Sequence, residues 1–367
     1  MRTALGLALV LVGCGGAAPA PPVAPPPPKA VCTDLASCER TCLATPGPSC
    51  TTAAVDMRRA PLETDVNRYL AVLDGACTAG NAAECFTAGR VIQDSPVLPG
   101  NEKRAKASFA RGCQLGDVIS CLNAENAQQQ TDWPALRTKL DRACTDGDGR
   151  ACGALGGLRL AIENDRDDFI AFSLRSAELI EKSCLAGTGS DCMLAALSLN
   201  TPALHIPGER ILTVLRRGCD LGDGPSCFGE ANMKGSSNDP DEVTKLALWR
   251  KACELQHPDA CYAVAMTSGD LPGFVHAVDL ATAKCEVGDS DACEVVATTL
   301  ATDQLTPAQV AAVGKLSQQA CDRHMLNVCY MISRALEKGP DERRDPARST
   351  KLQTDACSAG WVPACKN

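Results

Sequence analysis

The cysteines are the residues whose type and spacing could do chemistry in this sequence. The chain has 367 residues and 23 cysteines, and eighteen of the cysteines fall into nine pairs, each separated by seven residues. Cysteines at regular intervals can bind metal ions or oxidise to disulfide bridges. The nine pairs are Cys77–Cys85, Cys113–Cys121, Cys144–Cys152, Cys184–Cys192, Cys219–Cys227, Cys253–Cys261, Cys285–Cys293, Cys321–Cys329 and Cys357–Cys365.

Metal binding is the less favoured reading of these cysteines. Zinc sites prefer cysteines two to four residues apart with histidines close by, whereas this sequence has no Cys-x-x-Cys. Its four histidines lie far apart in the sequence, at His205, His257, His276 and His324. No Cys-x-x-Cys-His motif for attached haem occurs. The acidic stretch that begins at Asp146 has Arg150 where a calcium loop needs an oxygen ligand. We therefore predict disulfides, and neither a metal nor a cofactor.

The spacing of each pair requires the chain to reverse direction. Residues eight apart in one helix are about 12 Å apart along its axis, whereas bridged cysteines need Cα atoms within roughly 4.4–6.8 Å. A strand would separate them further. Each pair therefore predicts a helical hairpin with a bridge across its turn, and the pairs recur every 31 to 40 residues, which is typical of a stacked array.

The residues of each turn suit this reversal. The third residue after the first cysteine is glycine in seven of nine cases, and glycine adopts the left-handed conformation that ends helices. The next residue is Asn or Asp in five of nine, which can cap the following helix. An apolar residue lies four or five positions before each first cysteine and predicts a buried face: Leu73, Phe109, Leu140, Ile180, Leu215, Trp249, Leu280, Leu316 and Leu352.

The pattern Ala/Gly-Cys-x-x-Gly-Asp/Asn-x-x-x-Cys resembles the Sel-1-like repeat, a relative of the tetratricopeptide repeat. It is most similar to the disulfide-rich, Hcp-type cysteine-rich proteins of bacteria. Ala76–Cys85, Gly112–Cys121 and Gly218–Cys227 carry the match, which covers roughly Thr41 to Cys365. Two turns depart from it, because Gln256 and His324 stand where the glycine belongs. The resemblance implies an all-α, α/α solenoid of disulfide-stapled helical hairpins.

The N-terminal segment has features of an exported lipoprotein. Residues 1–13 form a short apolar signal that is followed by Cys14, and this junction resembles a bacterial lipoprotein box in which Cys14 is lipidated. Gly15 in the next position favours the outer membrane, by resemblance to known lipoproteins. Residues 14–30 are rich in Gly, Ala and Pro and read as an extended tether.

A degenerate unit follows the tether at residues 31–60. Its Cys42 and Cys50 repeat the seven-residue separation, which leaves Cys32 and Cys38 to each other. With Cys14 lipidated, the other 22 cysteines can close eleven bridges, as an oxidising compartment allows. Residues 61–367 form the repeat solenoid of nine units, the last truncated and its first helix polar, as an end cap requires.

The composition narrows the function. A net charge of −8 without a basic cluster argues against nucleic acid. We expect a stacked, rod-like array on the periplasmic side, attached to the membrane only through its lipid, that binds an envelope protein or peptide on a concave face and is not an enzyme. Exposed Arg137, Arg175 and Arg216 are candidate contacts on the first helices.

The alternative is an envelope enzyme. The Hcp-type resemblance implies β-lactam binding and weak β-lactamase activity, or action on peptidoglycan-related substrates. However, Ser-x-x-Lys, Ser-Asp-Asn and Lys-Thr-Gly are all missing from the sequence, as is a Gly-x-Ser-x-Gly motif. The sequence therefore predicts no catalytic residues, and turnover of reporter β-lactams would decide between the two hypotheses.

Overall fold

The structure is a computed structural model that describes residues 32, 34–98, 101–126, 133–234, 242–359 and 361–366. These residues form nineteen α-helices and four short 3-10 helices, with no strand among them. In order they are α1 (Leu35–Ala44), α2 (Pro48–Arg59), η1 (Pro61–Glu63), α3 (Val66–Thr78), α4 (Ala82–Asp94), α5 (Glu102–Gln114), α6 (Val118–Asn126), α7 (Trp133–Thr145), α8 (Gly149–Glu163), α9 (Arg166–Leu185), α10 (Gly189–Leu199), η2 (Pro202–Leu204), α11 (Gly208–Asp220), α12 (Gly224–Lys234), α13 (Glu242–Glu254), α14 (Pro258–Ser268), α15 (Leu271–Glu286), α16 (Ser290–Thr299), α17 (Pro307–Asp322), α18 (Leu326–Lys338), η3 (Asp341–Arg343), α19 (Pro346–Ser358) and η4 (Val362–Lys366).

Each odd-numbered α-helix forms a hairpin with the helix that follows it, and a disulfide joins the two arms. The ten bridges of eight-residue separation have Cα–Cα distances of 4.5–5.0 Å, so the chain reverses inside every one of them. With Cys32–Cys38, the described cysteines are joined in the same eleven pairs that the spacing predicts. The last hairpin differs, because its second arm is the 3-10 helix η4.

The turns form as the local sequence predicts. Six of the seven predicted glycines have φ between 82° and 117°; the seventh, Gly360, lies outside the described residues. At each of these turns the amide of the next residue donates to a carbonyl five residues earlier, as Asp117 does to Gly112 at 3.0 Å. The five predicted Asx residues then accept from amides of the following helix.

The two turns without glycine have the same backbone. Gln256 and His324 have φ of 62° and 63°, and the turn hydrogen bonds recur, from His257 to Ala252 at 3.0 Å and from Met325 to Ala320 at 3.2 Å. A side chain in this conformation costs about 1–2 kcal/mol, which glycine avoids. The hairpin therefore sets the turn geometry even where the residue type disfavours it.

Some of the bridges also pack against the next hairpin and so hold neighbouring repeats together. A Cβ atom added to Gly75 of α3 would lie 2.8 Å from Cys42 Sγ and 2.9 Å from Cys50 Sγ. In the same way Gly218 of α11 faces Cys192 of the preceding hairpin. Most of the predicted apolar positions are buried, and the following are at most 5% exposed: Leu73, Phe109, Leu140, Leu215, Leu280 and Leu316.

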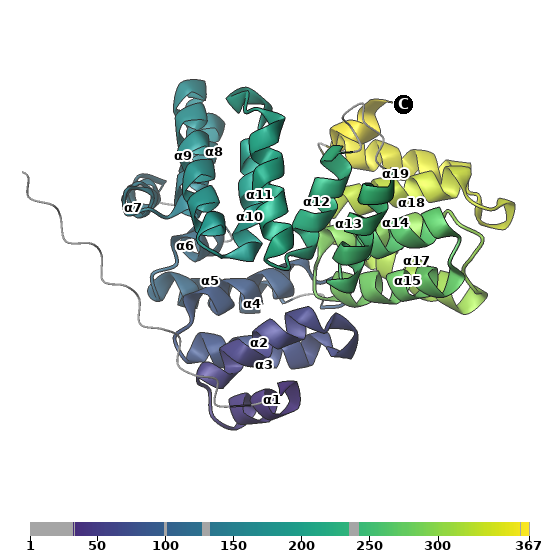
Figure 1. Cartoon of the computed structure of the whole chain (residues 1–367), viewed down its shortest axis with the longest axis horizontal. Coiled ribbons are helices and arrows are strands. Elements are labelled where there is room, and N and C mark those ends of the chain that lie inside the picture. Colours follow the sequence, from purple (N-terminus) through teal and green to yellow (C-terminus); the bar gives the residue numbers. More distant parts are fainter. Residues whose placement is uncertain are drawn as a thin grey trace, which may run out of the picture.

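The stacked array curves so far that its later repeats contact its first ones. Figure 1 shows α1 at the bottom, α8 and α9 at the top left, α12–α15 on the right, and α18, α19 and the C-terminus at the upper right. The later repeats contact the start of the array: η1 packs beside α15, and Val97 packs against the hydrophobic cores of both the first and the last repeats. Small rotations between successive repeats accumulate into this curvature. None of the described helices is long and apolar enough to cross a membrane.

Candidate functional site

The candidate site lies where the two ends of the array meet, which we call the seam. It brings the end of α4 and the link after it, Ile92–Leu98, against the turn after α15, Glu286–Gly288, and against Arg323 at the end of α17. The residues in contact are about 190 to 230 positions apart in the sequence. No spacing rule within a repeat could have predicted this junction.

Close backbone approach at Gly288 is the first element of the seam. Gly288 has a φ of 92°, and a Cβ atom added to it would lie 2.8 Å from Asp94 Cβ and 2.9 Å from Ser95 N. By contrast, nothing lies within 4 Å of the Cβ position at Gly116 or Gly187, which occupy the same turn position. Gly288 therefore serves both its own turn and the contact with α4.

Two side chains complete the seam with hydrogen bonds to backbone carbonyls. Ser95, which is fully buried, donates its hydroxyl to the carbonyl of Glu286. Arg323 donates from Nη2 to the carbonyls of Ile92, at 3.1 Å, and of Gln93. These carbonyls lie in the last turn of α4, where unpaired carbonyls and the helix dipole favour a cation.

Two hollows adjoin each other along the seam. The first, of about 510 Å³, lies between α5 and the end of α17, and the second, of about 440 Å³, lies between α4, α16 and the start of α18. Arg323 and His324 line both hollows. The first hollow is also lined by Gln93, Lys106, Phe109 and Asn123, and the second by Ser290, Met325, Asn327 and Trp361.

His324 is held exposed between the hollows by its left-handed turn. Ser290 lines the second hollow too, but the described hydrogen bonds join its hydroxyl to the amide of Asn327 at 3.2 Å and not to the imidazole. A nucleophile and its base must be within hydrogen-bond reach of each other. Among the described hydrogen bonds, therefore, none pairs His324 with a nucleophile at Ser290.

A third hollow, of about 570 Å³, lies between α7 and α8. Its two arginines, Arg137 and Arg159, both pair with Glu163. The other predicted contact residues are also engaged within the array: Arg175 donates to the carbonyl of Cys144 at 3.3 Å, and Arg216 pairs with Glu230 at 3.2 Å. These three arginines therefore already have partners within the array, and they stay candidates for binding alongside the seam.

The most strongly shifted titratable groups lie at the start of α14. Burial lowers the pKa of His257 to about 4, and the charge of Lys284 lowers it further. Burial raises the pKa of Asp259 to about 7, together with the negative charges of Asp291 and Asp289. His257 Nε2 and Asp259 Oδ2 are 3.8 Å apart, yet the imidazole is neutral at neutral pH. Neither residue lines the seam hollows.

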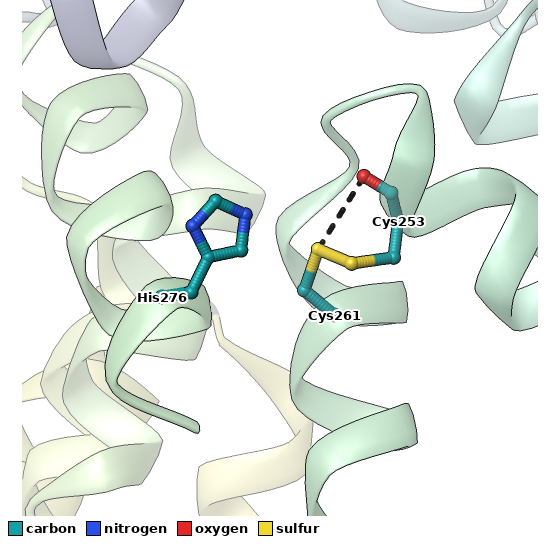
Figure 2. A group of neighbouring side chains, drawn as sticks. All are labelled: Cys253, Cys261 and His276. Carbon is teal, nitrogen blue, oxygen red and sulfur yellow. Dashed lines mark hydrogen bonds between the residues drawn. A yellow bond between two sulfur atoms is a disulfide. The ribbon is translucent and has the colours of Figure 1, made fainter. Parts of the chain in front are cut away.

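One group of described side chains could offer three ligand atoms to a metal ion. Cys253, Cys261 and His276 have potential ligand atoms within 4.8 Å of one another, and Figure 2 shows the imidazole facing the bridge. The two sulfur atoms are bonded to each other, with a Cα–Cα distance of 4.6 Å. A cysteine binds a metal ion as its thiolate, so Cys253 and Cys261 do not bind metal while their sulfur atoms are bonded to each other.

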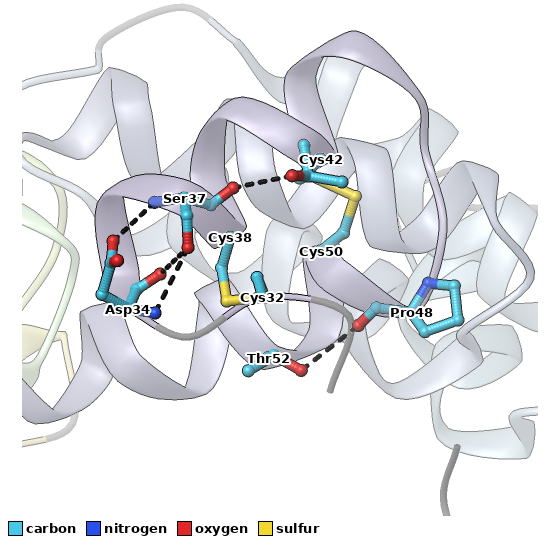
Figure 3. Close-up of a disulfide and its surroundings, with 9 residues drawn as sticks. Cys32, Asp34, Ser37, Cys38, Cys42, Pro48, Cys50 and Thr52 are labelled. Carbon is cyan, nitrogen blue, oxygen red and sulfur yellow. Dashed lines mark hydrogen bonds between the residues drawn. A yellow bond between two sulfur atoms is a disulfide. The ribbon is translucent and has the colours of Figure 1, made fainter. Parts of the chain in front are cut away.

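The N-terminal unit is a regular hairpin of α1 and α2, shown in Figure 3. Asp34 and Ser37 form a capping box at the start of α1, and Cys42–Cys50 closes the turn. Cys32–Cys38 ties the chain that enters from the N-terminal side to the first turns of α1. The predicted lipidation residue Cys14, the signal and the tether all lie outside the described residues.

The sequence holds two signals for the seam. The apolar run Pro96-Val97-Leu98 lies in a link that would be polar if it were simply exposed, and Ser95 and Pro96 are buried. The turn Arg323-His324-Met325, which departs from the repeat pattern, contacts another part of the array through Arg323.

Solved structures that are similar to this chain include two repeat proteins. No family model matches the chain, and no similar sequence was found among curated proteins. Among solved structures, a Sel1 repeat protein from Oxalobacter formigenes is similar, with 17% identity, a TM-score of 0.38, and coverage of 80% of this chain and 87% of that one. The protective antigen c5321 of uropathogenic Escherichia coli, which displays an SLR fold, has 12% identity, a TM-score of 0.41, and coverage of 90% and 73%.

The chain is therefore an all-α repeat protein of stacked helical hairpins, each stapled by a disulfide. This class rests on the helices and bridges of the chain itself. Bridges in this number are typical of proteins that fold in an oxidising compartment outside the cytoplasm.

We predict that Gly288→Ala opens the seam. The added methyl group would clash with the backbone of Asp94 and Ser95, so the two ends must separate. Small-angle scattering should show a larger radius of gyration than that of the native protein. Gly116→Ala is the matched control, because it imposes the same left-handed strain without a neighbour within 4 Å. Equal radii for the two variants would contradict the role of Gly288.

We predict that Asp259→Asn changes how stability depends on pH. The folded pKa of Asp259 exceeds the unfolded value of about 3.9, so its stabilising contribution is lost as pH rises through about 7. The folded pKa of His257 is below the unfolded value of about 6.5, so its contribution is lost as pH falls from there toward about 4. The two effects oppose each other between about pH 4 and 6.5.

The variant should therefore be more stable than the native protein at pH 8, and its stability should rise more steeply with pH between 4 and 6.5. Urea unfolding at a series of pH values measures this. Asp303→Asn in the exposed link before α17 is the control and should leave the profile unchanged. Identical profiles for Asp259→Asn and the native protein would contradict the pKa assignment.

Proposed function

We propose that this protein is a non-catalytic lipoprotein of the cell envelope that binds an extended segment of a partner protein along the seam. The observation that carries the proposal is the pair of adjoining hollows that share Arg323 and His324. An extended peptide needs a continuous groove with both polar and apolar contacts. The seam offers the amide of Gln93 and the ammonium of Lys106 in the first hollow and the partly exposed ring of Trp361 in the second.

The position of the groove supports a scaffold rather than a single-repeat binder. Its walls come from α4–α6 at one end of the array and from α16–α18 at the other. A segment that contacts both walls would hold the two ends together, whereas a segment on one repeat would not. The envelope part of the proposal is supported by the eleven bridges and by the resemblance of the Cys14 junction to a lipoprotein box.

Binding at the seam is tested by site-specific photo-crosslinking. A photoreactive residue at position 324 of the full chain, expressed in its own envelope, should give an adduct of discrete mass. The same residue at Arg142 of α7, a side chain 86% exposed and remote from the seam hollows, should give none. Equal labelling from both positions, or none from either, would count against the seam as the binding surface.

Lipid attachment is tested separately. If Cys14 carries the lipid, Cys14→Ser should move the protein from the membrane fraction to the soluble fraction, because one or two acyl chains supply the membrane affinity. The native chain should label with a radioactive fatty acid and the variant should not. Membrane retention of an unlabelled Cys14→Ser protein would contradict the lipoprotein assignment. The proposal of binding at the seam does not depend on this result.

A further inference from the structure

One bridge of the array has a neighbour that the others do not share. Cys253 and Cys261 join α13 to α14, and His276 reaches the bridge from the second turn of α15. Among the described residues, this is the group in which three potential metal ligands lie within 4.8 Å of one another. Figure 2 shows that the imidazole comes from a different helix and faces the two sulfur atoms. The hairpin and the repeat after it therefore meet at this group.

The ligand set matches a soft or borderline metal ion once the bridge is open. Zinc binds cysteine thiolates at about 2.3 Å and imidazole nitrogen at about 2.0–2.1 Å, in tetrahedral geometry. Two thiolates on one such ion are roughly 3.8 Å apart by that geometry. The Cα atoms of Cys253 and Cys261 are 4.6 Å apart across a turn that further hydrogen bonds also define, so rotation of the two side chains supplies the separation.

We propose that Cys253, Cys261 and His276 form a redox-gated zinc site, which is closed to metal while the bridge is oxidised and binds one Zn²⁺ ion after the bridge is reduced. A dithiol reductant supplies two electrons and two protons to the bridge and becomes a cyclic disulfide itself. Each new thiol then loses its proton on binding the ion, and the neutral imidazole contributes a nitrogen lone pair. Three protein ligands leave the fourth position to water.

The surroundings of the group allow this chemistry. Cys261 is 2% exposed, but Cys253 and His276 are partly exposed, so a dithiol can approach from the Cys253 side. The ion would join the same two residues that the bridge joined, so the hairpin would keep its turn in both states. Reduction would then exchange one cross-link for another instead of loosening this repeat.

The test uses zinc-dependent protection of thiols in the full chain. The oxidised protein is treated with graded amounts of a dithiol, with or without Zn²⁺, alkylated, and mapped by peptide mass. With zinc present, Cys253 and Cys261 should be protected from alkylation. The remaining bridges of the described chain have no such third ligand and are internal controls. Titration of the reduced protein with Co²⁺ should show thiolate-to-metal absorption that saturates at one ion per chain.

His276→Gln is the matched variant, because it keeps the bridge and removes one ligand. Its intact mass should show all bridges formed, and both zinc protection and the cobalt spectrum should be lost. Protection that persists in this variant, or that is equal at every bridge, would overturn the site. Opening of Cys253–Cys261 only together with unfolding of the whole chain would overturn it as well.

Discussion

The covalent bond across each turn is the constraint on which the rest of the structure depends. A helical hairpin of about 30 residues buries too little apolar surface to be stable alone. A bridge that closes a nine-residue ring contributes about 2.5 kcal/mol in the chain-entropy model. The bridges also form part of the packing between hairpins, since Gly75 and Gly218 let the helix backbone lie against the sulfur or Cβ atoms of the preceding pair. At these two places the atoms of one bridge therefore join the two helices of their own hairpin and also contact the next hairpin.

What the sequence predicted well was set within short stretches of chain. The reversal follows from the distance between two cysteines, and the left-handed residue and the Asx cap follow from the next four positions, as in Cys113–Asp117. A concave face was expected, but the degree of curvature that brings the later repeats against the first could not be predicted in this way, because it is the sum of small rotations over all repeats. The seam was missed for the same reason, since Ser95 meets Glu286 across 191 positions and Arg323 meets Ile92 across 231.

Identical backbone positions serve different purposes along the array. Gly116 and Gly288 have nearly the same φ. Of these two, only Gly288 has the backbone of another repeat within 3 Å of the position that an added Cβ atom would take. Gln256 and His324 both replace the turn glycine and accept the strained conformation, but His324 follows the arginine that contacts α4 and Gln256 does not. Arg323 thus adds a contact with another repeat at its turn, but nothing in the structure explains why His324 and Gln256 replace glycine.

The described contacts that stabilise the seam are accompanied by the partial desolvation of two carboxylates. Burial raises the pKa of both Asp94 and Glu286, so each carboxylate is partly desolvated where the ends meet. The hydrogen bonds of Ser95 and Arg323 and the packing of Val97 offset this cost of desolvation. A junction balanced in this way responds to any ligand that contacts both walls, because binding to the closed form alone shifts the equilibrium toward closure. If the proposed partner binds at the seam, closure and binding are therefore thermodynamically linked, and a change that weakens one weakens the other.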